Sequence, residues 1–414
     1  LCKIFFKYIF MKILSLSFIL LSFVKKFTST CYTYIYIIKG AIMKITKKIS
    51  YLFTIGMVGL SLTACGGEAN NAGNEQAKLD LNSMTVEEIT AKAKEEGEVN
   101  SVGMPDSWAN WKETWADLDS EYGIKHVDTD MSSAEELAIF ENEKDNASAD
   151  IGDVGIAFGP EAKNRGLLLP YKTSYYDEIP DWAKDSENEG YWLLSYTGTM
   201  AFIVDTDATG GKVPTSWKEV LEGDYAVTIG DVSSGNQDQF ALLSAAIAYG
   251  GDETNLQPGL DYFAKLAEKG KLNVQGSTTA TLQAGEHAVV PMWDFNALSA
   301  QDELGSDRFK VVIPQDGATM SGYTTILNAY SKRPHAAALA REYILSDAGQ
   351  NNLARGHARP IRENVKLDED AKAALLPDSE YENANVYPIK DHDAWNEVLP
   401  NLGNMWQENV ISKM

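Results

Sequence analysis

An acid and an amide alternate with aromatic residues in the segment Trp293-Asp294-Phe295-Asn296, directly after an apolar run. A carboxylate beside aromatic faces suits a protonated amine, because cation-π attraction and a charge-assisted hydrogen bond act together. Asp294 could equally cap the helix that follows, with Trp293 in the core. We therefore predict an ammonium site at Trp293, Asp294 and Asn296, with helix capping as the alternative.

A second polar loop, Ser233-Ser234-Gly235-Asn236, precedes an Ala-rich helix predicted over 239–249. Hydroxyls and backbone N–H groups at the start of a helix can hold a carboxylate or phosphate. The same residue types are also the usual helix caps. Ser234, Gly235 and Asn236 are thus predicted either to bind an acidic group of a ligand or to cap the helix.

Other candidates lie in loops after predicted strands. Trp108 could stack on a ligand, or it could join Trp111 and Trp115 on the core face of a helix over 108–118. Ser321-Gly322-Tyr323 is expected where the chain crosses back between lobes, and Gly322 would let the backbone approach a ligand closely. The full predicted ligand-binding set is Trp108, Ser132, Phe158, Ser234, Gly235, Asn236, Trp293, Asp294, Asn296, Ser321, Tyr323 and Arg359.

Arg359 and Arg362 flank Pro360 in a turn, where one arginine could clamp an anionic group. The alternative is a surface arginine on an acidic protein. The five histidines show no metal-ligand spacing, and we predict neither a metal site nor a cofactor.

These loops need a sheet to position them, and the pattern of the chain predicts one. Thr85 with Glu88 forms a capping-box pattern for a helix that ends at Gly97, and Ser132 with Glu135 forms another. Strands are expected at 99–102, 123–127, 149–156, 191–204, 226–229, 287–293, 309–313 and 323–329, with a helix at 334–345 and a helical tail over 360–414. Alternating strands and helices imply an α/β fold with ligand loops at the strand ends.

The N-terminal region carries an export signal. Residues 43–64 combine a basic start, an apolar run and Leu62-Thr63-Ala64 before Cys65, which is typical of a lipoprotein signal peptide. The polar residues 65–78 are predicted to be a flexible tether behind a lipid-modified Cys65. Residues 1–42 contain no acidic residue and are interpreted as upstream sequence translated in frame, with a second membrane segment as the alternative.

Charge excludes one class of partner. Residues 1–64 hold nine of the 36 Lys and Arg residues and none of the 59 acidic ones, which leaves the expected mature chain at about −32. Nucleic acid is therefore a poor partner, since phosphate binding requires Lys and Arg. Cys2 and Cys31 precede the signal and Cys65 would carry lipid, so no disulfide is expected in the mature protein.

Four segments, in this order, carry a family resemblance: Ala149-Asp150-Ile151-Gly152-Asp153-Val154, Val213-Pro214-Thr215-Ser216-Trp217-Lys218-Glu219, Ser346-Asp347-Ala348-Gly349-Gln350 and Arg359-Pro360-Ile361-Arg362. The chain resembles the substrate-binding lipoproteins of ABC importers, in the group that binds polyamines, thiamine, ferric iron and aminophosphonates. The resemblance implies two α/β lobes of the type II periplasmic-binding-protein class, joined by crossing strands and closing on a ligand.

The lobes are expected at 79–204 with about 326–360, and at 205–325 with about 361–414. The implied function is capture of a small charged solute, an amine or zwitterion such as a polyamine or aminophosphonate, by a monomer that delivers it to an ABC permease and its ATPase subunits. A ferric-iron or thiamine binder is the alternative, although the paired tyrosines of ferric binders are missing from the later lobe and Tyr175-Tyr176 lies too early. A secreted lipoprotein enzyme is the alternative from another class, but the chain lacks the Gly-x-Ser-x-Gly, His-Glu-x-x-His and P-loop motifs.

Overall fold

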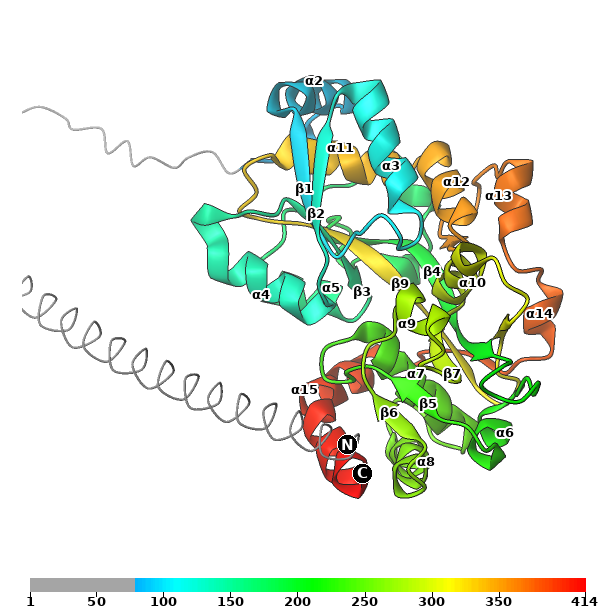
Figure 1. Cartoon of the computed structure of the whole chain (residues 1–414). Helices are drawn as coiled ribbons and strands as arrows, with labels where there is room; N and C mark the ends of the chain where they lie inside the picture. Colours follow the sequence, from blue (N-terminus) through cyan, green and yellow to red (C-terminus); the bar gives the residue numbers. More distant parts are fainter. Residues whose placement is uncertain (1–78) are drawn as a thin grey trace, which may run out of the picture. The chain divides into compact units, whose positions relative to one another are not determined.

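Strands from both halves of the chain join one hydrogen-bonded sheet (Figure 1). The computed structural model describes residues 79–414, so the predicted signal peptide, Cys65 and the tether lie outside the described residues. The strands are β1 (Glu98–Val102), β2 (Lys125–Thr129), β3 (Ile151–Gly155), β4 (Trp192–Asp205), β5 (Val227–Ile229), β6 (Leu272–Val274), β7 (Val289–Trp293), β8 (Phe309–Val312), β9 (Ala318–Leu327), β10 (Arg359–Pro360) and β11 (Val386–Pro388). Their order is β2-β1-β3-β9-β4-β7-β5-β6, with β8 and β10 paired to β4 and β11 paired to β9.

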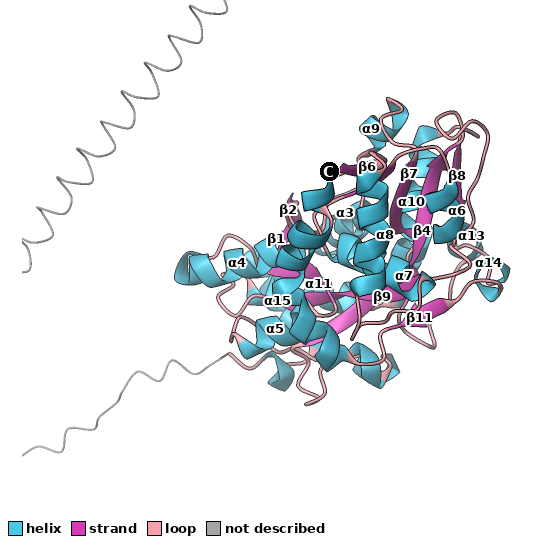
Figure 2. Cartoon of the chain, turned by 90° about the horizontal axis from the view of Figure 1, so that it is seen from below, coloured by secondary structure: helices cyan, strands magenta, loops and turns pink. Residues whose placement is uncertain are grey.

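Helices cover the strands of both lobes (Figures 1 and 2). The helices are α2 (Val86–Glu96), α3 (Trp111–Asp117), α4 (Ser133–Glu143), α5 (Phe158–Asn164), α6 (Trp217–Glu222), α7 (Asn236–Ala248), α8 (Gln257–Glu268), α9 (Thr279–Gln283), α10 (Asp294–Leu304), α11 (Pro334–Ile344), α12 (Asp347–Arg355), α13 (Glu369–Ala374), α14 (Ser379–Glu382) and α15 (His392–Asn409).

Two crossing strands connect the lobes. β1 pairs in parallel with β2 and β3 in the first lobe, and β5 pairs in parallel with β6 and β7 in the second. The antiparallel strands β4 and β9 run between them, and β4 changes its pairing partner from β9 to β7 between Thr199 and Met200. The predicted two-lobed α/β class is confirmed. The residue boundaries proposed for the lobes stay predictions.

The predicted start and end of the first long helix, α2, are confirmed. The Thr85 side chain accepts the N–H of Glu88 while Glu88 accepts the N–H of Thr85, and Gly97 ends α2 with φ 72°, a left-handed conformation that glycine adopts without strain. At the start of α4, the Glu135 carboxylate accepts both the backbone N–H of Ser132 (2.9 Å) and its hydroxyl (2.8 Å).

Two expectations for helices need correction. The helix predicted from Trp108 begins only at Trp111, because Ala109 and Asn110 have φ angles of 47° and 58° and break the helical path. Trp108 therefore does not share a helix with Trp111 and Trp115. The tail after Pro360 is not wholly helical either, since β11 interrupts it to pair with β9.

Two glycines on the crossing strands leave no room for a side chain. A Cβ on Gly322 would lie 2.4 Å from the carbonyl oxygen of Tyr196, and one on Gly198 would lie 2.5 Å from the Phe295 ring. Gly322 is thus required by the backbone of the partner strand, and the predicted close approach to a ligand stays a prediction.

We expect Gly322→Ala to lower the free energy of unfolding by about 1–3 kcal/mol, because backbone atoms cannot yield to the added methyl group. Gly276→Ala is the matched control, since a Cβ there meets nothing within 4 Å. Urea denaturation of both variants measures the difference, and equal stability would contradict the close packing.

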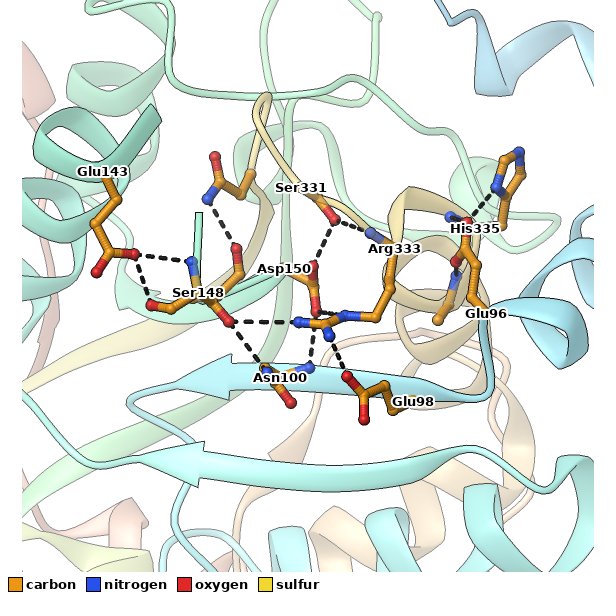
Figure 3. Close-up of polar contacts among 12 residues, drawn as sticks. Glu96, Glu98, Asn100, Glu143, Ser148, Asp150, Ser331, Arg333 and His335 are labelled. Atoms are coloured by element: carbon orange, nitrogen blue, oxygen red, sulfur yellow. Dashed lines mark hydrogen bonds and ion pairs between the residues drawn. The ribbon is translucent and has the colours of Figure 1, made fainter. Parts of the chain in front are cut away.

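A polar network connects the segment before α11 to the N-terminal ends of β1 and β3 (Figure 3). The buried Asp150 accepts hydrogen bonds from the hydroxyl of Ser331 (2.7 Å), Nε of Arg333 (2.7 Å) and the backbone N–H of Asn100 (2.9 Å). Arg333 also pairs with Glu98 at the start of β1. The network joins β1, the start of β3 and the segment that leads into α11.

Arg333→Met should destabilise the protein by about 2–4 kcal/mol, because it leaves the buried Asp150 carboxylate without its cation. The neighbouring Lys332 is exposed, so Lys332→Met should change stability little. Thermal unfolding of the two variants side by side provides the measurement, and similar losses in both would argue against a structural role for the ion pair.

Candidate functional site

An aromatic cluster occupies the junction between the lobes. Trp108 lies before α3, Tyr196 on β4, Tyr323 on β9 and Phe295 on α10. Tyr196 and Tyr323 face each other across the two strands and stack at 5.6 Å with 9° between the rings. Trp108 meets Tyr323 at 5.3 Å and Phe295 at 5.5 Å, both edge to face. Rings from both lobes therefore pack together at the crossing strands.

Hydrogen bonds connect this cluster to a buried acid. The indole N–H of Trp108 donates to the Tyr196 hydroxyl at 2.6 Å, and that hydroxyl donates to Oδ2 of Asp153 at 2.6 Å. Asp153 is only 2% exposed, and its Oδ1 has no hydrogen bond of normal geometry within residues 79–414, although the buried indole N–H of Trp111 lies near enough to act on the carboxyl group. Trp293 donates to the Tyr323 hydroxyl at 3.0 Å. The cluster thus ends on a carboxyl group with an unused oxygen.

Burial raises the pKa of Asp153 to about 8, although the side chains of Tyr196 and Trp111 act in the opposite direction. Burial also raises the pKa of Glu136 well above its usual range, and the nearby Asp153 charge adds to the effect. Asp128 has a raised pKa for the same principal reason. None of the ion pairs formed within residues 79–414 involves these three acids. The first lobe therefore presents acidic groups without a protein cation.

Asn236 reaches from the second lobe to the first. It is the first residue of α7, it is 2% exposed, and neither atom of its amide has a hydrogen-bond partner in the described part of the chain. A Cβ on Gly155 would lie 2.3 Å from this amide, so the two lobes touch here. The hydroxyl of Ser234 instead donates to Asp231 at 3.0 Å, and Gly235 is the N-cap residue of α7.

The predicted ammonium ligand Asp294 is enclosed by protein groups. It is 1% exposed and accepts the N–H groups of Thr199 (3.0 Å) and Phe295 (2.9 Å) and the hydroxyl of Tyr381 (2.6 Å). A solute amine would have to displace Tyr381 to reach this carboxylate. The capping alternative matches these contacts in part, since the N–H of Phe295 belongs to α10, and the ligand role stays a prediction.

The remaining predicted residues are dispersed. Asn296 donates to Gln237 at 2.9 Å, close to the buried Trp293. Ser132 donates to Glu135 at 2.8 Å in its helix cap. Arg359 lies over the Tyr381 ring at 4.5 Å, pairs with Asp378 at 3.2 Å, and lies opposite Thr197 of β4.

Two cavities border the turn that follows β3. One, of about 620 Å³, lies between α5 and α15 and is lined by Ala157, the predicted Phe158 and the buried Gln239, among others. The other, of about 330 Å³, is lined by residues that include Ile156 and the predicted Ser321. Figure 2 shows α15 beside α5 at this side of the molecule. Both cavities are lined by segments of both lobes.

Sequence reasoning missed the acid and the tyrosine at the centre of the cluster. Asp153 stood within a family-like segment and Tyr196 within an apolar strand. The only available signal was an acid inside an otherwise apolar strand, because a charged residue in such a position is costly unless it has a function.

Within residues 79–414, no three or more His, Cys, Asp or Glu side chains gather in an arrangement that could hold a metal ion. No helix in the same range is long and apolar enough to cross a membrane.

A two-lobed α/β fold with crossing strands and polar groups between the lobes defines the class of periplasmic binding proteins. Residues 146–386 match the family model of the bacterial extracellular solute-binding proteins, and the chain belongs to that family.

The sulfate-binding protein of Salmonella typhimurium is 25% identical over 209 residues, which cover 48% of this chain and 63% of that protein. The chain thus spans less than two thirds of this curated relative. Among solved structures, the periplasmic binding protein P5PA is 18% identical with a TM-score of 0.63, covering 76% of this chain and 99% of its own. The protein AfuA from Actinobacillus pleuropneumoniae, with exogenous fructose-6-phosphate bound, is 18% identical with a TM-score of 0.60, covering 76% and 98%.

Asp153→Asn should stabilise the unliganded protein at pH 8 by roughly 2–4 kcal/mol. Between about pH 4 and 8 the folded wild type keeps a proton that the unfolded chain has lost, so its stability falls as pH rises across this window. The asparagine variant lacks that decline, and its advantage should nearly vanish at pH 4. Urea unfolding at pH 4, 6 and 8 measures the difference, and a constant difference would show that burial does not perturb Asp153.

Proposed function

We propose that the protein is the solute-binding component of an ABC importer and captures a small organic solute that carries a protonated amino group. It would hold the solute between its lobes and deliver it to a membrane permease, tethered to the cell surface by a lipid on Cys65. The observation that carries the proposal is the buried Asp153, which has an unpartnered oxygen and no protein cation beside the aromatic cluster.

A cationic group meets two needs of this site. It would stabilise the ionised form of a carboxyl group that burial otherwise keeps protonated, and it would lie against ring faces whose electrons attract cations. Trp108 comes from the first lobe and Phe295 from the second, so separation of the lobes would uncover their rings. Closure over an amine would bring both walls onto it.

The similarity to sulfate-binding proteins favours an anion instead, and the unpartnered Asn236 amide at the start of α7 offers one donor for it. The lining of the larger cavity gives this candidate little support. Arg165, which lines that cavity, already pairs with Glu141 and Glu161. An amino group paired with an acidic group, as in a zwitterion, would satisfy both features.

A thermal-shift panel should separate these ligands. We expect 1,4-diaminobutane, 2-phenylethylamine, thiamine or 2-aminoethylphosphonate to raise the melting temperature, because a ligand that binds only the folded state stabilises it. Sulfate, fructose 6-phosphate and ferric iron should not. Binding of the amine should strengthen by up to about tenfold per pH unit from pH 6 to 8, as Asp153 must lose its proton.

Asp153→Asn should bind the amine more weakly than wild type, and its affinity should not change between pH 6 and 8. Asp294→Asn is the matched control, because the Asp294 carboxylate is also buried but already accepts three hydrogen bonds from protein groups. If only Asp294→Asn lost amine binding, Asp294 and not Asp153 would be the amine ligand. If only sulfate raised the melting temperature, the protein would be an anion binder and the proposal would be wrong.

A further inference from the structure

We propose that the cavity of about 330 Å³ beside Trp182 binds a flat apolar ring, so that the captured solute is an aromatic amine. We call it the Trp182 cavity; its walls include Ile156, Trp182, Met320, Ser321, Ile389 and His392. The amino group in this statement rests on the proposed function, whereas the ring site stands on the cavity itself.

The size and the lining of the Trp182 cavity suit a ring. Pockets for small organic molecules commonly measure roughly 300–1,000 Å³ and are mostly apolar with a few polar groups. Ile156, Met320 and Ile389 supply an apolar surface, and all three belong to segments that pack into the protein. An open-chain polyamine would leave its charged groups facing these side chains without hydrogen bonds, which is unfavourable.

Trp182 lies at the rim and is unusually exposed. Its side chain is 48% exposed, whereas Ile179 and Ala183 on either side are buried and hold the segment in place. No aromatic or cation-π partner of Trp182 occurs among residues 79–414. An indole held in this way can stack on a planar ligand at little entropic cost.

Ser321 contributes one polar contact. It lines the Trp182 cavity, it is 7% exposed, and its hydroxyl oxygen has no hydrogen-bond partner in the described chain. A buried hydroxyl without a partner costs free energy that a ligand donor would recover. A ring N–H is a donor of the required kind.

The opposite wall is held firmly on the second lobe. β11 pairs with β9, where Pro388 lies opposite Met320. The buried Glu253 accepts the N–H groups of Lys390 (2.8 Å) and Asp391 (2.7 Å) and the hydroxyl of Tyr387 (2.7 Å). Since Trp182 and Ile156 belong to the first lobe, a ring between these walls would contact both lobes and favour their closure.

The test uses 5-fluoroindole, which has the ring and its N–H but no amino group, followed by fluorine NMR with the purified protein. Saturable line broadening is expected with wild type. Binding should weaken at least tenfold in Trp182→Ala and be largely restored in Trp182→Phe. Tyr249→Ala is the control, because Tyr249 is a comparably exposed aromatic residue (36%) that does not line the cavity.

Ser321→Ala provides a second readout. Wild type should prefer 5-fluoroindole over its 1-methyl derivative by about threefold or more, and the variant should lose this preference. No saturable binding to wild type, or equal binding to Trp182→Ala, would overturn the proposal.

Loss of 5-fluoroindole binding in Asp153→Asn with retention in Trp182→Ala would place the ring at the aromatic cluster and likewise overturn it. 5-Fluoroindole carries no amino group, so its binding tests the ring site even if none of the amines in the thermal-shift panel binds. Conversely, binding of open-chain amines with no 5-fluoroindole binding would support the proposed function and reject the ring site.

Discussion

The antiparallel pairing of β4 with β9 is the constraint on which the rest of the structure depends. These strands belong to both lobes, and their backbones approach so closely that only glycine fits at Gly322. The same pairing sets Tyr196 opposite Tyr323 and brings Asp153 of the adjoining strand within reach of the Tyr196 hydroxyl. A shift in this register would separate the aromatic side chains and would also change how the two lobes are joined.

The electrostatics of the cleft follow from where acids are buried. Asp150 is equally buried, yet it has Arg333 and stays part of a structural network. Asp153, three residues later and within β3, has a tyrosine and no cation, and burial raises its pKa to about 8. The difference between a satisfied and an unsatisfied buried carboxyl separates the structural end of the strand from the end that faces the proposed ligand site.

Much of the local structure could be predicted because its causes are local. The caps at Thr85 and Ser132 and the end of α2 at Gly97 depend on residues within one helical turn. The break before α3 could not be predicted in this way, since nothing in the residue types of Ala109 and Asn110 demands their positive φ angles. Among the predicted site residues, Trp108 and Tyr323 lie side by side, although Tyr323 is inside β9 and not in a loop. Hydrogen bonding to Tyr381 encloses Asp294, and Tyr381 lies 87 positions away in the sequence.

The sequence by itself determined the α/β class, the alternation of strands and helices, and the resemblance to solute-binding proteins, because periodicity and motif order are properties of the chain. Only the tertiary structure decided which polar atoms keep partners. Asp153, Asn236 and Ser321 are left with unpartnered atoms between the lobes, while Ser132, Ser234 and Asp294 are not. Whether a side chain is free for a ligand depends on contacts made by residues far away in sequence, and no local pattern encodes them.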